Sequence, residues 1–376
     1  MSDPNHRALE LPEPLRDGST VLQRDAELYE AASRKNIERY VGCARVPVGL
    51  AGPVRIHGEH VDGEVVVPLA TTEGTLVAST HRGMKVLNEC GGVIARVTRK
   101  GGIQRAPVLF FATVDAALAC ARALESDWRW LMPIAAQSTR HGVLTGLTAV
   151  VQGRAVHLRL SMDAGDAAGQ NMVSVAASHV VAALAEKFGG LERALMEGGF
   201  SGEKVPSALN HLLGRGRAVV ASADISASVL ERITRAKASE VVHFFQTYVN
   251  AGSWGGFHNT HAALINILPA IYIATGQDVA SVPESCLAQN AFDWREREGV
   301  LRWDVLIPNL VAGTVGGGTG LPTQHECLAL MGCAGAGKLD RFAEIVAATA
   351  LASELSFWSA ILAGEWVAAH AGLKDR

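Results

Sequence analysis

The chain has 376 residues, of which 48% are hydrophobic and 19% charged, and its formal net charge is −3. This length allows two or more compact units with a sizeable core, and the composition excludes an intrinsically disordered chain. The net charge gives no general argument for a nucleic acid or an anionic membrane as partner, and the strongest basic cluster, RVTRKGGIQR at 96–105, is short.

Cysteine usage and hydropathy predict a soluble protein of the cytoplasm. The six cysteines form no CxxC motif, which indicates a reducing compartment and argues against a cysteine metal site. The polar N-terminal stretch lacks the pattern of a signal peptide. No apolar run reaches the roughly 18 residues of a membrane span, and the nearest is ALINILPAIYIATG.

The first 105 residues predict a short helical segment and then strands. Residues 1–37 combine a proline-rich polar start with a helical pattern, so we expect an N-terminal helical segment there. The stretch that follows has strand-forming runs broken by glycine and proline, ending in GEVVVPLA. TLVASTHRGMKVL then predicts a helix of small residues.

Residues 106–198 predict a ferredoxin-like unit inserted into a larger one. A strand at 106–113 precedes a helix, two strands that turn at Gly153-Arg154, and a second helix from 168 to 189. With a last strand that the sequence leaves undefined, this order is the split βαβ pattern. The larger unit then comprises residues 38–105 and 199–376.

The second part of the larger unit is rich in helix. Residues 226–250 show apolar spacings of three and four, and a long helix is predicted from near Leu339 to about Ala369. The expected fold class is therefore α+β, with a large, mainly helical domain, an inserted ferredoxin-like domain and a small N-terminal helical segment.

A single carboxylate, Glu73, lies in the stretch PLATTEGTLVAST among threonines and small apolar residues. Thr71 and Thr72 are candidate N-cap residues, which would put Glu73 in or near the first turn of the helix. A glutamate that compensates the helix dipole is one interpretation. The local sequence does not decide whether the carboxylate has this bland role or a functional one.

Two glycine-bearing segments favour a nucleotide cofactor. DAGDAAGQNMV at 163–173 enters a helix whose first N–H groups are free to bind an anion, and GTVGGGTG at 313–320 allows a close approach of the backbone. Neither matches the GxGxxG motif of a Rossmann fold, and for each segment a plain tight turn is the alternative. HNTH, with His258 and His261, lacks a third ligand, so no metal site is predicted.

These segments together resemble, in order over nearly the whole chain, the hydroxymethylglutaryl-CoA reductase family, specifically its class with an ATTEG motif. The matching segments are NIERYVGCARVPVGLAGP, PLATTEGTLVASTHRG, DAAGQNMVS, GRGRAVVA, ATGQDVA, GTVGGGTGLPTQ and LASELSFWSAILAGEWVAAH. The resemblance implies a four-electron reduction of a thioester to a primary alcohol, with NADPH or NADH as cofactor and an acyl-CoA as substrate. By default the product is mevalonate.

Roles for individual residues follow from the resemblance alone. Glu73 would be the catalytic acid, with a pKa raised by burial as proton donation near neutral pH requires. Lys204 would stabilise the oxyanion, while Asp278 would join both in a hydrogen-bond network. His370 would protonate the CoA thiolate. The implied cofactor-binding residues are Asp166, Ala168, Gly169, Gln170, Asn171, Met172, Gly313, Thr314, Val315 and Gly316. The implied substrate-binding residues are Glu38, Arg105, Val205, His243 and Asn259.

The acyl-binding positions depart from the family pattern. The D-K-K-P segment reads Glu203-Lys204-Val205-Pro206, a serine position is Glu197, and a further lysine falls on or near His243. The family's asparagine corresponds to Asn259 or Asn266. Either Arg105 and His243 suffice to hold a substrate carboxylate, or the enzyme reduces a different acyl or carrier-bound thioester.

The resemblance also implies a homodimer, or a higher homo-oligomer, with active sites at the subunit interface. A non-catalytic CoA- or nucleotide-binding homologue is a third hypothesis, although such a protein has no need of all four catalytic positions. Nothing in the sequence distinguishes NADH from NADPH.

Overall fold

The computed structural model describes residues 36–137, 139 and 142–365, together with Glu27, Tyr29, Glu30 and Arg34. Most of the predicted N-terminal segment and His370 lie outside the described residues. The strands are β1 (Val48–Gly58), β2 (Asp62–Ala70), β3 (Val93–Arg105), β4 (Val108–Phe111), β5 (Val143–Gln152), β6 (Ala155–Asp163), β7 (Leu191–Leu195), β8 (Gly216–Ser226), β9 (Gln289–Arg295) and β10 (Val300–Leu310).

Helices contain more residues than strands, and the predicted α+β class is confirmed. The α-helices are α2 (Leu76–Glu89), α3 (Val114–Ser126), α4 (Met132–Ala136), α5 (Gln170–Lys187), α6 (Ala208–Leu213), α7 (Ala227–Thr234), α8 (Ala238–Trp254), α9 (Leu264–Thr275), α10 (Val282–Ser285), α11 (Pro322–Leu330) and α12 (Leu339–Leu362). Short 3-10 helices are η3 (Arg129–Leu131), η4 (Val279–Ser281) and η5 (Gly317–Gly320).

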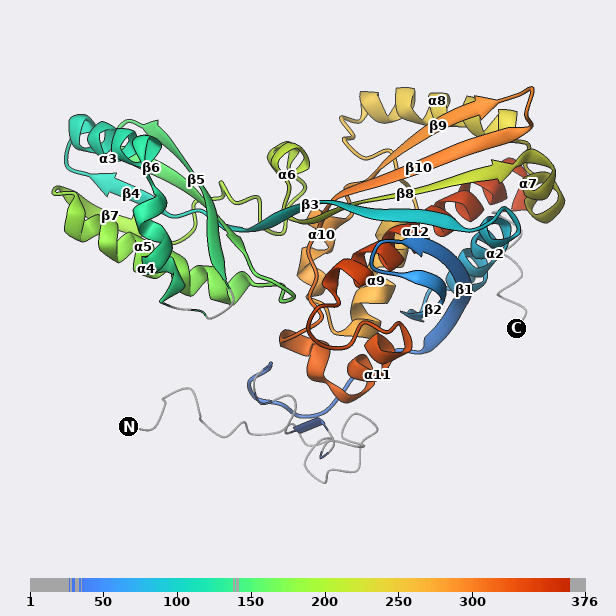
Figure 1. Ribbon diagram of the computed structural model, residues 1–376, viewed down its shortest axis with the longest axis horizontal. Coiled ribbons are helices and arrows are strands. Elements are labelled where there is room, and N and C mark those ends of the chain that lie inside the picture. The colour runs from blue at the N-terminus through green and yellow to red at the C-terminus, as the bar shows by residue number, and fades with distance from the viewer. Residues whose placement is uncertain are drawn as a thin grey trace.

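The larger body is a sheet in the order β2-β1-β3-β8-β10-β9 with helices packed on it (Figure 1). β1 and β3 are parallel, and the other neighbouring pairs are antiparallel. Helix α12 contacts β3, β8, α2 and α9, and it is buried along most of its length. Burial of one apolar helix against a sheet and two further helices removes a large apolar area from water, which stabilises this body.

Strands β8, β9 and β10 were not among the expected elements. The predicted helix at 226–250 is two helices, α7 and α8, because Arg235 adopts a left-handed conformation with φ 63° and ends α7. The long helix begins at Leu339 as predicted but ends at Leu362, short of Ala369. Gly364, with φ 68°, turns the chain just after this end.

Among the described residues, α12 is the one helix long and apolar enough to cross a membrane by length and composition. Its most apolar window is 78% buried inside the protein. That burial is what a central core helix requires.

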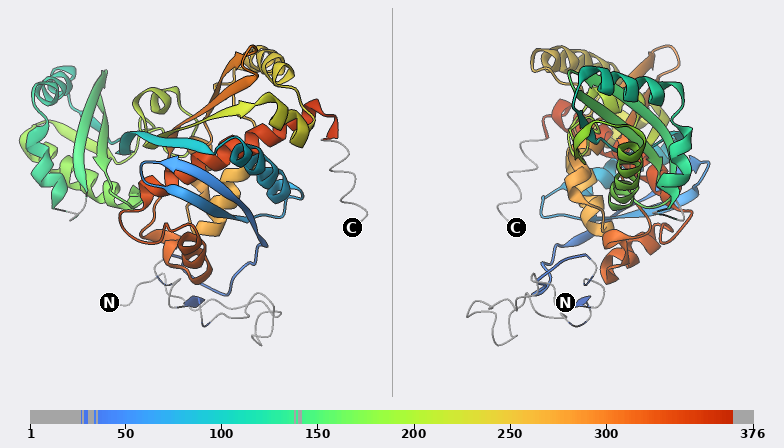
Figure 2. Two further views of the ribbon diagram at one scale, coloured as in Figure 1. Left: turned by 45° about the vertical axis from the view of Figure 1, so that its right-hand side comes forward. Right: turned by 90° about the vertical axis from the view of Figure 1, so that its left-hand side faces the viewer.

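The smaller body is a sheet of four strands in the order β7-β4-β6-β5, all antiparallel, covered by α3, α4 and α5 (Figure 2). Numbered along the chain, this order is 4-1-3-2, which confirms the ferredoxin-like topology. The last strand, which the sequence left undefined, is β7. The side chains between the sheet and its helices form a hydrophobic cluster separate from that of the larger body.

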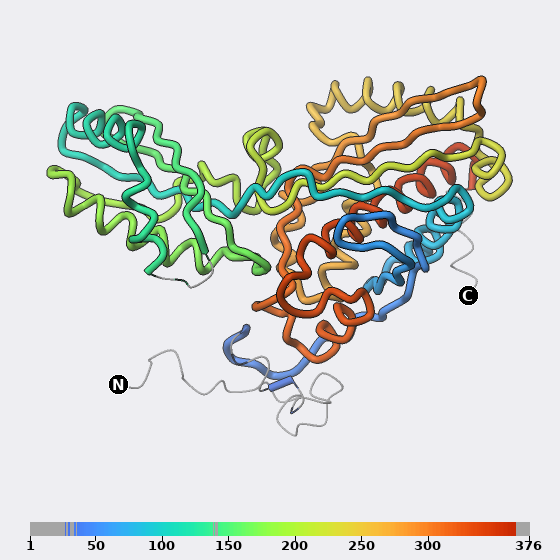
Figure 3. The backbone as a smooth tube through the Cα atoms, in the orientation of Figure 1, coloured from blue at the N-terminus to red at the C-terminus, as the bar shows by residue number. Residues whose placement is uncertain are grey.

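Strand β3 joins the two bodies (Figure 3). Its residues Ile94–Gly102 pair with β8 of the larger sheet, whereas Ile103–Arg105 pair with β6 of the smaller one. The chain later returns between the bodies through the segment that precedes α6. Residues at the end of β3 and in this returning segment therefore meet at the junction.

Candidate active site

The loop that contains Glu73 lies between β2 and α2 and differs from the prediction. The N-cap residue of α2 is Thr75, with φ 70°, rather than Thr71 or Thr72. Thr71 instead turns the loop, because its hydroxyl oxygen accepts the N–H of Glu73 at 2.9 Å. Glu73 thus precedes the helix and is not part of its first turn.

The carboxylate of Glu73 is exposed in the single chain and is bonded to Asn266 of α9. The Nδ2 group of Asn266 lies 2.9 and 3.1 Å from the two carboxylate oxygens. The pair faces a cavity of about 480 Å³ between α2, α9 and the end of α12. The expected burial of Glu73 is absent in the single chain. Residues 71–75 of the loop are exposed or half-buried, and the first buried side chain after Glu73 is that of Leu76.

Lys204 and Asp278 form an ion pair, with Nζ and Oδ2 separated by 3.2 Å. Each side chain is about two-fifths exposed. Asp278 is oriented by a second bond, since its Oδ1 accepts the N–H of Ala280 at the start of η4. Lys204 has a φ of 60°, a left-handed conformation that is uncommon for a residue with a side chain.

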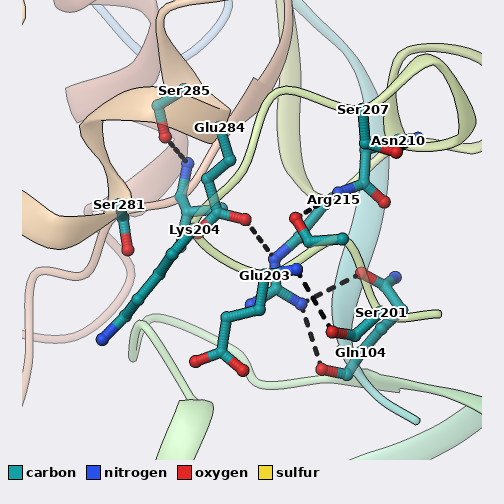
Figure 4. A network of polar contacts seen from close by, with 12 residues as sticks. Gln104, Ser201, Glu203, Lys204, Ser207, Asn210, Arg215, Ser281, Glu284 and Ser285 are labelled. Atoms are coloured by element: carbon teal, nitrogen blue, oxygen red, sulfur yellow. Dashed lines mark hydrogen bonds and ion pairs between the residues drawn. The ribbon is translucent and has the colours of Figure 1, made fainter. Parts of the chain in front are cut away.

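Beneath Lys204 lies a fully buried ion pair that the sequence analysis missed (Figure 4). Arg215 Nε is 2.5 Å from Glu284 Oε2, and both side chains are inaccessible to solvent. Burial raises the pKa of Glu284, and Arg215 together with bonds from the Lys204 N–H and the Ser281 hydroxyl opposes that rise. The Glu284 carboxylate therefore lies on the buried side of the Lys204 backbone. The sequence did contain a sign of the buried Glu284, since this residue is a lone carboxylate among apolar and small residues in SVPESCL. The same pattern drew attention to Glu73.

Lys204 and Asp278 stand in the wall of a second cavity, of about 710 Å³, which we call the Lys204 cavity. Both glycine-bearing segments line it. The residues that they contribute are Ala167, Ala168, Gly169, Gln170, Asn171, Met172, Gly313, Val315, Gly316, Gly317, Gly318 and Thr319. The structure thus brings together segments that lie far apart in the sequence.

The two glycine segments touch each other directly. Ala167 and Val315 form a parallel bridge, and a Cβ on Gly313 would lie 2.6 Å from the backbone nitrogen of Ala168. Only glycine allows this approach at position 313. The predicted cofactor residues Asp166 and Thr314 lie behind the wall. Asp166 supports it, accepting the N–H groups of Gly337 and Leu339 on its carboxylate, and Thr314 is buried.

The cavity has the features that a dinucleotide requires. Helix α5 begins at Gln170 after Gly169, whose φ is 75°, so the free N–H groups of its first turn stand at the cavity wall. Nothing lies within 4 Å of a Cβ built on Gly316 or Gly317, so this part of the loop is open. The residues present therefore fit a phosphate-containing cofactor.

Arg105, at the end of β3, lies between two carboxylates. Its Nη1 contacts Glu203 and is 3.3 Å from Glu197 Oε2, while Nη2 donates to the carbonyl oxygen of Gln170. The Arg105 side chain is 13% exposed. This cation is therefore already paired within the protein.

The other predicted substrate residues are not gathered at Lys204, apart from its neighbour Val205, which is half exposed. Glu38 is exposed in the segment before β1, and His243 lies on α8 beside a separate small cavity. Asn259 is committed to the backbone, since its amide bonds to His261 N, His261 O and Ala288 N. Asn266, the alternative asparagine, is the one that reaches Glu73.

Glu73 and the Lys204–Asp278 pair lie at opposite ends of α9. Asn266 is in the first turn of this helix, and Asp278 follows its last turn. At 1.5 Å per residue, the two ends are about 18 Å apart. Within the described part of the chain, the two cavities share no lining residue.

Comparison with known proteins assigns this arrangement to one family. A family profile described as hydroxymethylglutaryl-coenzyme A reductase matches residues 10–375. The 3-hydroxy-3-methylglutaryl-coenzyme A reductases of Aeropyrum pernix and Methanothermobacter thermautotrophicus are each 40% identical, over 94% and 92% of this chain and 83% and 86% of theirs. The class II 3-hydroxy-3-methylglutaryl-CoA reductase of Streptococcus pneumoniae, solved with NADPH in open conformations, has the same fold, with a TM-score of 0.71 and 20% identity over 90% of this chain and 82% of that one.

Proposed function

The chain belongs to the hydroxymethylglutaryl-coenzyme A reductase family, and on this basis we propose that it reduces the thioester of an acyl-CoA to a primary alcohol with NADPH or NADH. The observation that carries this proposal is the Lys204–Asp278 pair in the wall of the cavity lined by both glycine segments. The first substrate to test is 3-hydroxy-3-methylglutaryl-CoA, because the relatives are named for it. Its products would be mevalonate and CoA.

The reaction consumes one thioester, two reduced nicotinamides and two protons, and it releases the alcohol and free CoA thiol. The start of α5 with Gly313, Val315 and Gly316 would hold the cofactor, each molecule of which would supply one hydride, so that two molecules would bind in turn and leave oxidised. Lys204 would stabilise negative charge on the carbonyl oxygen, with Asp278 fixing the position of its ammonium group. Glu73 would donate a proton to that oxygen, and His370 would protonate the CoA thiolate.

We propose that the active unit is a homodimer in which Glu73 of one subunit faces Lys204 and Asp278 of the other. Two observations support this. The two groups lie about 18 Å apart along α9 within one chain, too far for one substrate carbonyl. Both are also exposed at the surface, where a partner can cover them. Burial at such an interface would provide the apolar surroundings that Glu73 lacks in the single chain.

We further propose that the protein is of the ATTEG class, soluble and cytoplasmic. Support comes from the ATTEG sequence itself, and from 40% identity to archaeal relatives against 20% to the class II structure. The division into residues 1–37, 38–105 with 199–376, and 106–198 is likewise proposed. It is supported by the two separate hydrophobic clusters.

The test is nicotinamide oxidation by the purified protein with 3-hydroxy-3-methylglutaryl-CoA, using NADPH and NADH separately. We expect oxidation with release of free CoA, and we expect the Lys204→Ala variant to bind cofactor but not to turn over. A folded wild-type protein that binds CoA and nicotinamide yet oxidises neither cofactor with any acyl-CoA would favour the non-catalytic binding hypothesis.

A further inference from the structure

The turn after α9, which contains Asp278, is bound to the second glycine segment by the side chain of Gln277. Oε1 of Gln277 accepts the N–H of Gly313 at 2.8 Å, and Nε2 donates to the carbonyl oxygen of Gly313 at 2.9 Å. Nε2 also donates to the carbonyl oxygen of Thr275 at 3.2 Å. The amide group is therefore bonded to the main chain through both of its polar atoms, and the donor and acceptor of Gly313 fix its orientation.

The backbone leaves this turn little freedom. Helix α9 ends at Gly276, with φ 72°, and the N–H groups of Gly276 and Gln277 both bond to the carbonyl oxygen of Tyr272. A Cβ on Gly318 would lie 2.7 Å from the carbonyl oxygen of Gly276, so the second glycine segment packs directly on the end of the helix. A displacement of Gly313 would therefore displace the turn as well.

A second bond connects the same turn to the first glycine segment. Nε2 of Gln170, the first residue of α5, donates to the hydroxyl oxygen of Ser281 at 3.1 Å. Ser281 is buried, and its N–H bonds to the carbonyl oxygen of Asp278. Asp278 thus lies between two bonds, one to each of the segments that a cofactor would contact.

Asp278 extends this connection to Lys204. Its Oδ1 accepts the N–H of Ala280 at 3.0 Å, and its Oδ2 is 3.2 Å from Lys204 Nζ. The side chains of Gln170, Gln277, Asp278 and Lys204 belong to residues that all line the Lys204 cavity. The cavity wall, the turn and the ammonium group therefore form one continuous set of bonded groups.

We propose that Gln277 is a positioning residue that couples cofactor binding in the Lys204 cavity to the placement of the Lys204–Asp278 pair, with Ser281 as the second link. The inference rests on the proposed function and adds to it a means by which the ammonium group is in place when the hydride donor is bound. Coupling between two sites is reciprocal. Removing the ammonium group therefore changes the cofactor affinity through Gln277.

A double-mutant cycle on cofactor affinity measures this coupling. Gln277→Met keeps the approximate length of the side chain and removes the amide, and Lys204→Ala removes the ammonium group. The Kd values of NADPH and NADH, from nicotinamide fluorescence, are needed for the wild type, both single variants and the double variant. The factor by which Lys204→Ala weakens binding should be about 5-fold or more larger in the wild-type background than in the Gln277→Met background.

Asn88→Leu is the matched control. Asn88 of α2 bonds to the backbone as Gln277 does, since its Oδ1 accepts the N–H of Arg55 and its Nδ2 donates to the carbonyl oxygen of Pro53, both at 2.8 Å. It is not among the described residues that line the Lys204 cavity or the cavity at Glu73. A cycle with Asn88→Leu in place of Gln277→Met should be additive within about 2-fold.

Ser281→Ala breaks the second link with a smaller change of structure. Its cycle with Lys204→Ala should show coupling of the same sign, which tests the proposal even if Gln277→Met folds poorly.

Steady-state kinetics separate positioning from a purely structural role. Gln277→Met should raise the cofactor KM and also lower kcat at saturating cofactor, because the Lys204 ammonium group is misplaced even when the cavity is occupied. A purely structural residue would affect stability while the folded enzyme kept its kcat, as we expect for Asn88→Leu. An unchanged kcat in folded Gln277→Met would overturn the positioning role.

Binding and turnover separate this proposal from the reductase function. Additive Kd values in both the Gln277→Met and the Ser281→Ala cycles overturn the coupling, whether or not a thioester is reduced. Coupled Kd values with no turnover of any acyl-CoA support the coupling and contradict the reductase function. A folded wild-type protein that binds neither NADPH nor NADH overturns both.

Discussion

Lys204 has a left-handed backbone conformation, which costs a residue with a side chain roughly 1–2 kcal/mol. Such a conformation persists only where the surroundings impose it. Here the buried carboxylate of Glu284 lies close to the Lys204 N–H, and Arg215 holds Glu284 in place. We therefore expect the buried Arg215–Glu284 pair to support the backbone of Lys204, while Asp278 holds its ammonium group.

Glu284→Gln should lower both stability and kcat. Removing one charge from a buried pair typically costs about 3–5 kcal/mol, and the lost carboxylate no longer anchors Lys204. Urea unfolding and nicotinamide oxidation measure the two effects. Glu344→Gln is the control, because Glu344 is equally buried but accepts the N–H groups of residues 59–61. It should destabilise the fold while the remaining folded enzyme keeps its kcat, and an equal loss of kcat would contradict the anchoring role of Glu284.

The two candidate asparagines should behave oppositely. Asn266→Ala removes a donor from the Glu73 carboxylate at an exposed position, so kcat should fall while unfolding free energy changes by less than about 1 kcal/mol. Asn259→Ala removes three bonds to the backbone and should cost about 2–3 kcal/mol. Thermal unfolding and steady-state kinetics on both variants distinguish them. A loss of kcat in the Asn259→Ala variant alone would indicate that Asn259, and not Asn266, acts in the active site.

At the scale of elements, the start of α12 is tied to the sheet by Asp340. Its carboxylate accepts from Arg217 of β8 at 2.6 Å and is 2.8 Å from Lys100 of β3. Burial alone would raise the pKa of Asp340, but bonds to Lys100 and Arg217 outweigh it and hold this pKa below its ordinary value. These contacts fix the start of α12, where the N–H of Leu339 bonds to Asp166 of the first glycine segment.

Asp340→Asn should destabilise the protein in a pH-dependent way. Because the folded-state pKa lies below the unfolded value of about 3.9, the unfolded chain binds more protons between the two values, and stability rises with pH there. The stabilisation that Asp340 provides is fully present above the unfolded-state pKa, and it is lost as the pH falls through the folded-state pKa. The variant should lose about 1.5–3 kcal/mol at pH 7, and the difference should shrink below about pH 4 in denaturant titrations.

Asp62→Asn is the control for this pH dependence, because Asp62 is 70% exposed in its pair with Arg55. It should change the stability little at either pH. A difference between the wild type and Asp340→Asn that stays constant from pH 7 to pH 3 would contradict the linkage.

At the scale of the whole molecule, two bodies share one continuous strand, β3, and one cavity wall built from both. Val315 and Gly313 come from the larger body and Ala167 and Ala168 from the smaller one, and they meet across the bridge at Ala167. A cofactor in the Lys204 cavity would therefore contact both bodies. Glu73, the proposed acid, lies at the other end of α9, where it is bonded to Asn266.

Subunit complementation tests the proposed dimer. Glu73→Gln and Lys204→Ala should each abolish turnover alone. Refolded together, they should recover about a quarter of the wild-type activity, because half of the dimers are mixed and each mixed dimer has one intact site. Complete absence of recovery, with mixed dimers demonstrated by differently tagged chains, would place all catalytic groups within one subunit.

The sequence by itself determined the family, the α+β class, the ferredoxin-like strand order and the segments that line the Lys204 cavity. These properties follow from local patterns: apolar periodicity, glycine-bearing segments, and motifs of a few neighbouring residues. The helix boundaries that were predicted wrongly had local causes too. At Arg235 and at Thr75, a single residue in a left-handed conformation moved the boundary of a helix.

Only the tertiary structure decided which polar groups pair. Glu73 and Asn266 are 193 residues apart in the chain, and Arg105 and Glu203 are 98 apart. No local pattern encodes such a bond, because it depends on how β3, α9 and the returning segment pack. The same packing paired Arg105, a predicted substrate ligand, with two glutamates, and it placed the Glu73–Asn266 and Lys204–Asp278 pairs at opposite ends of one helix.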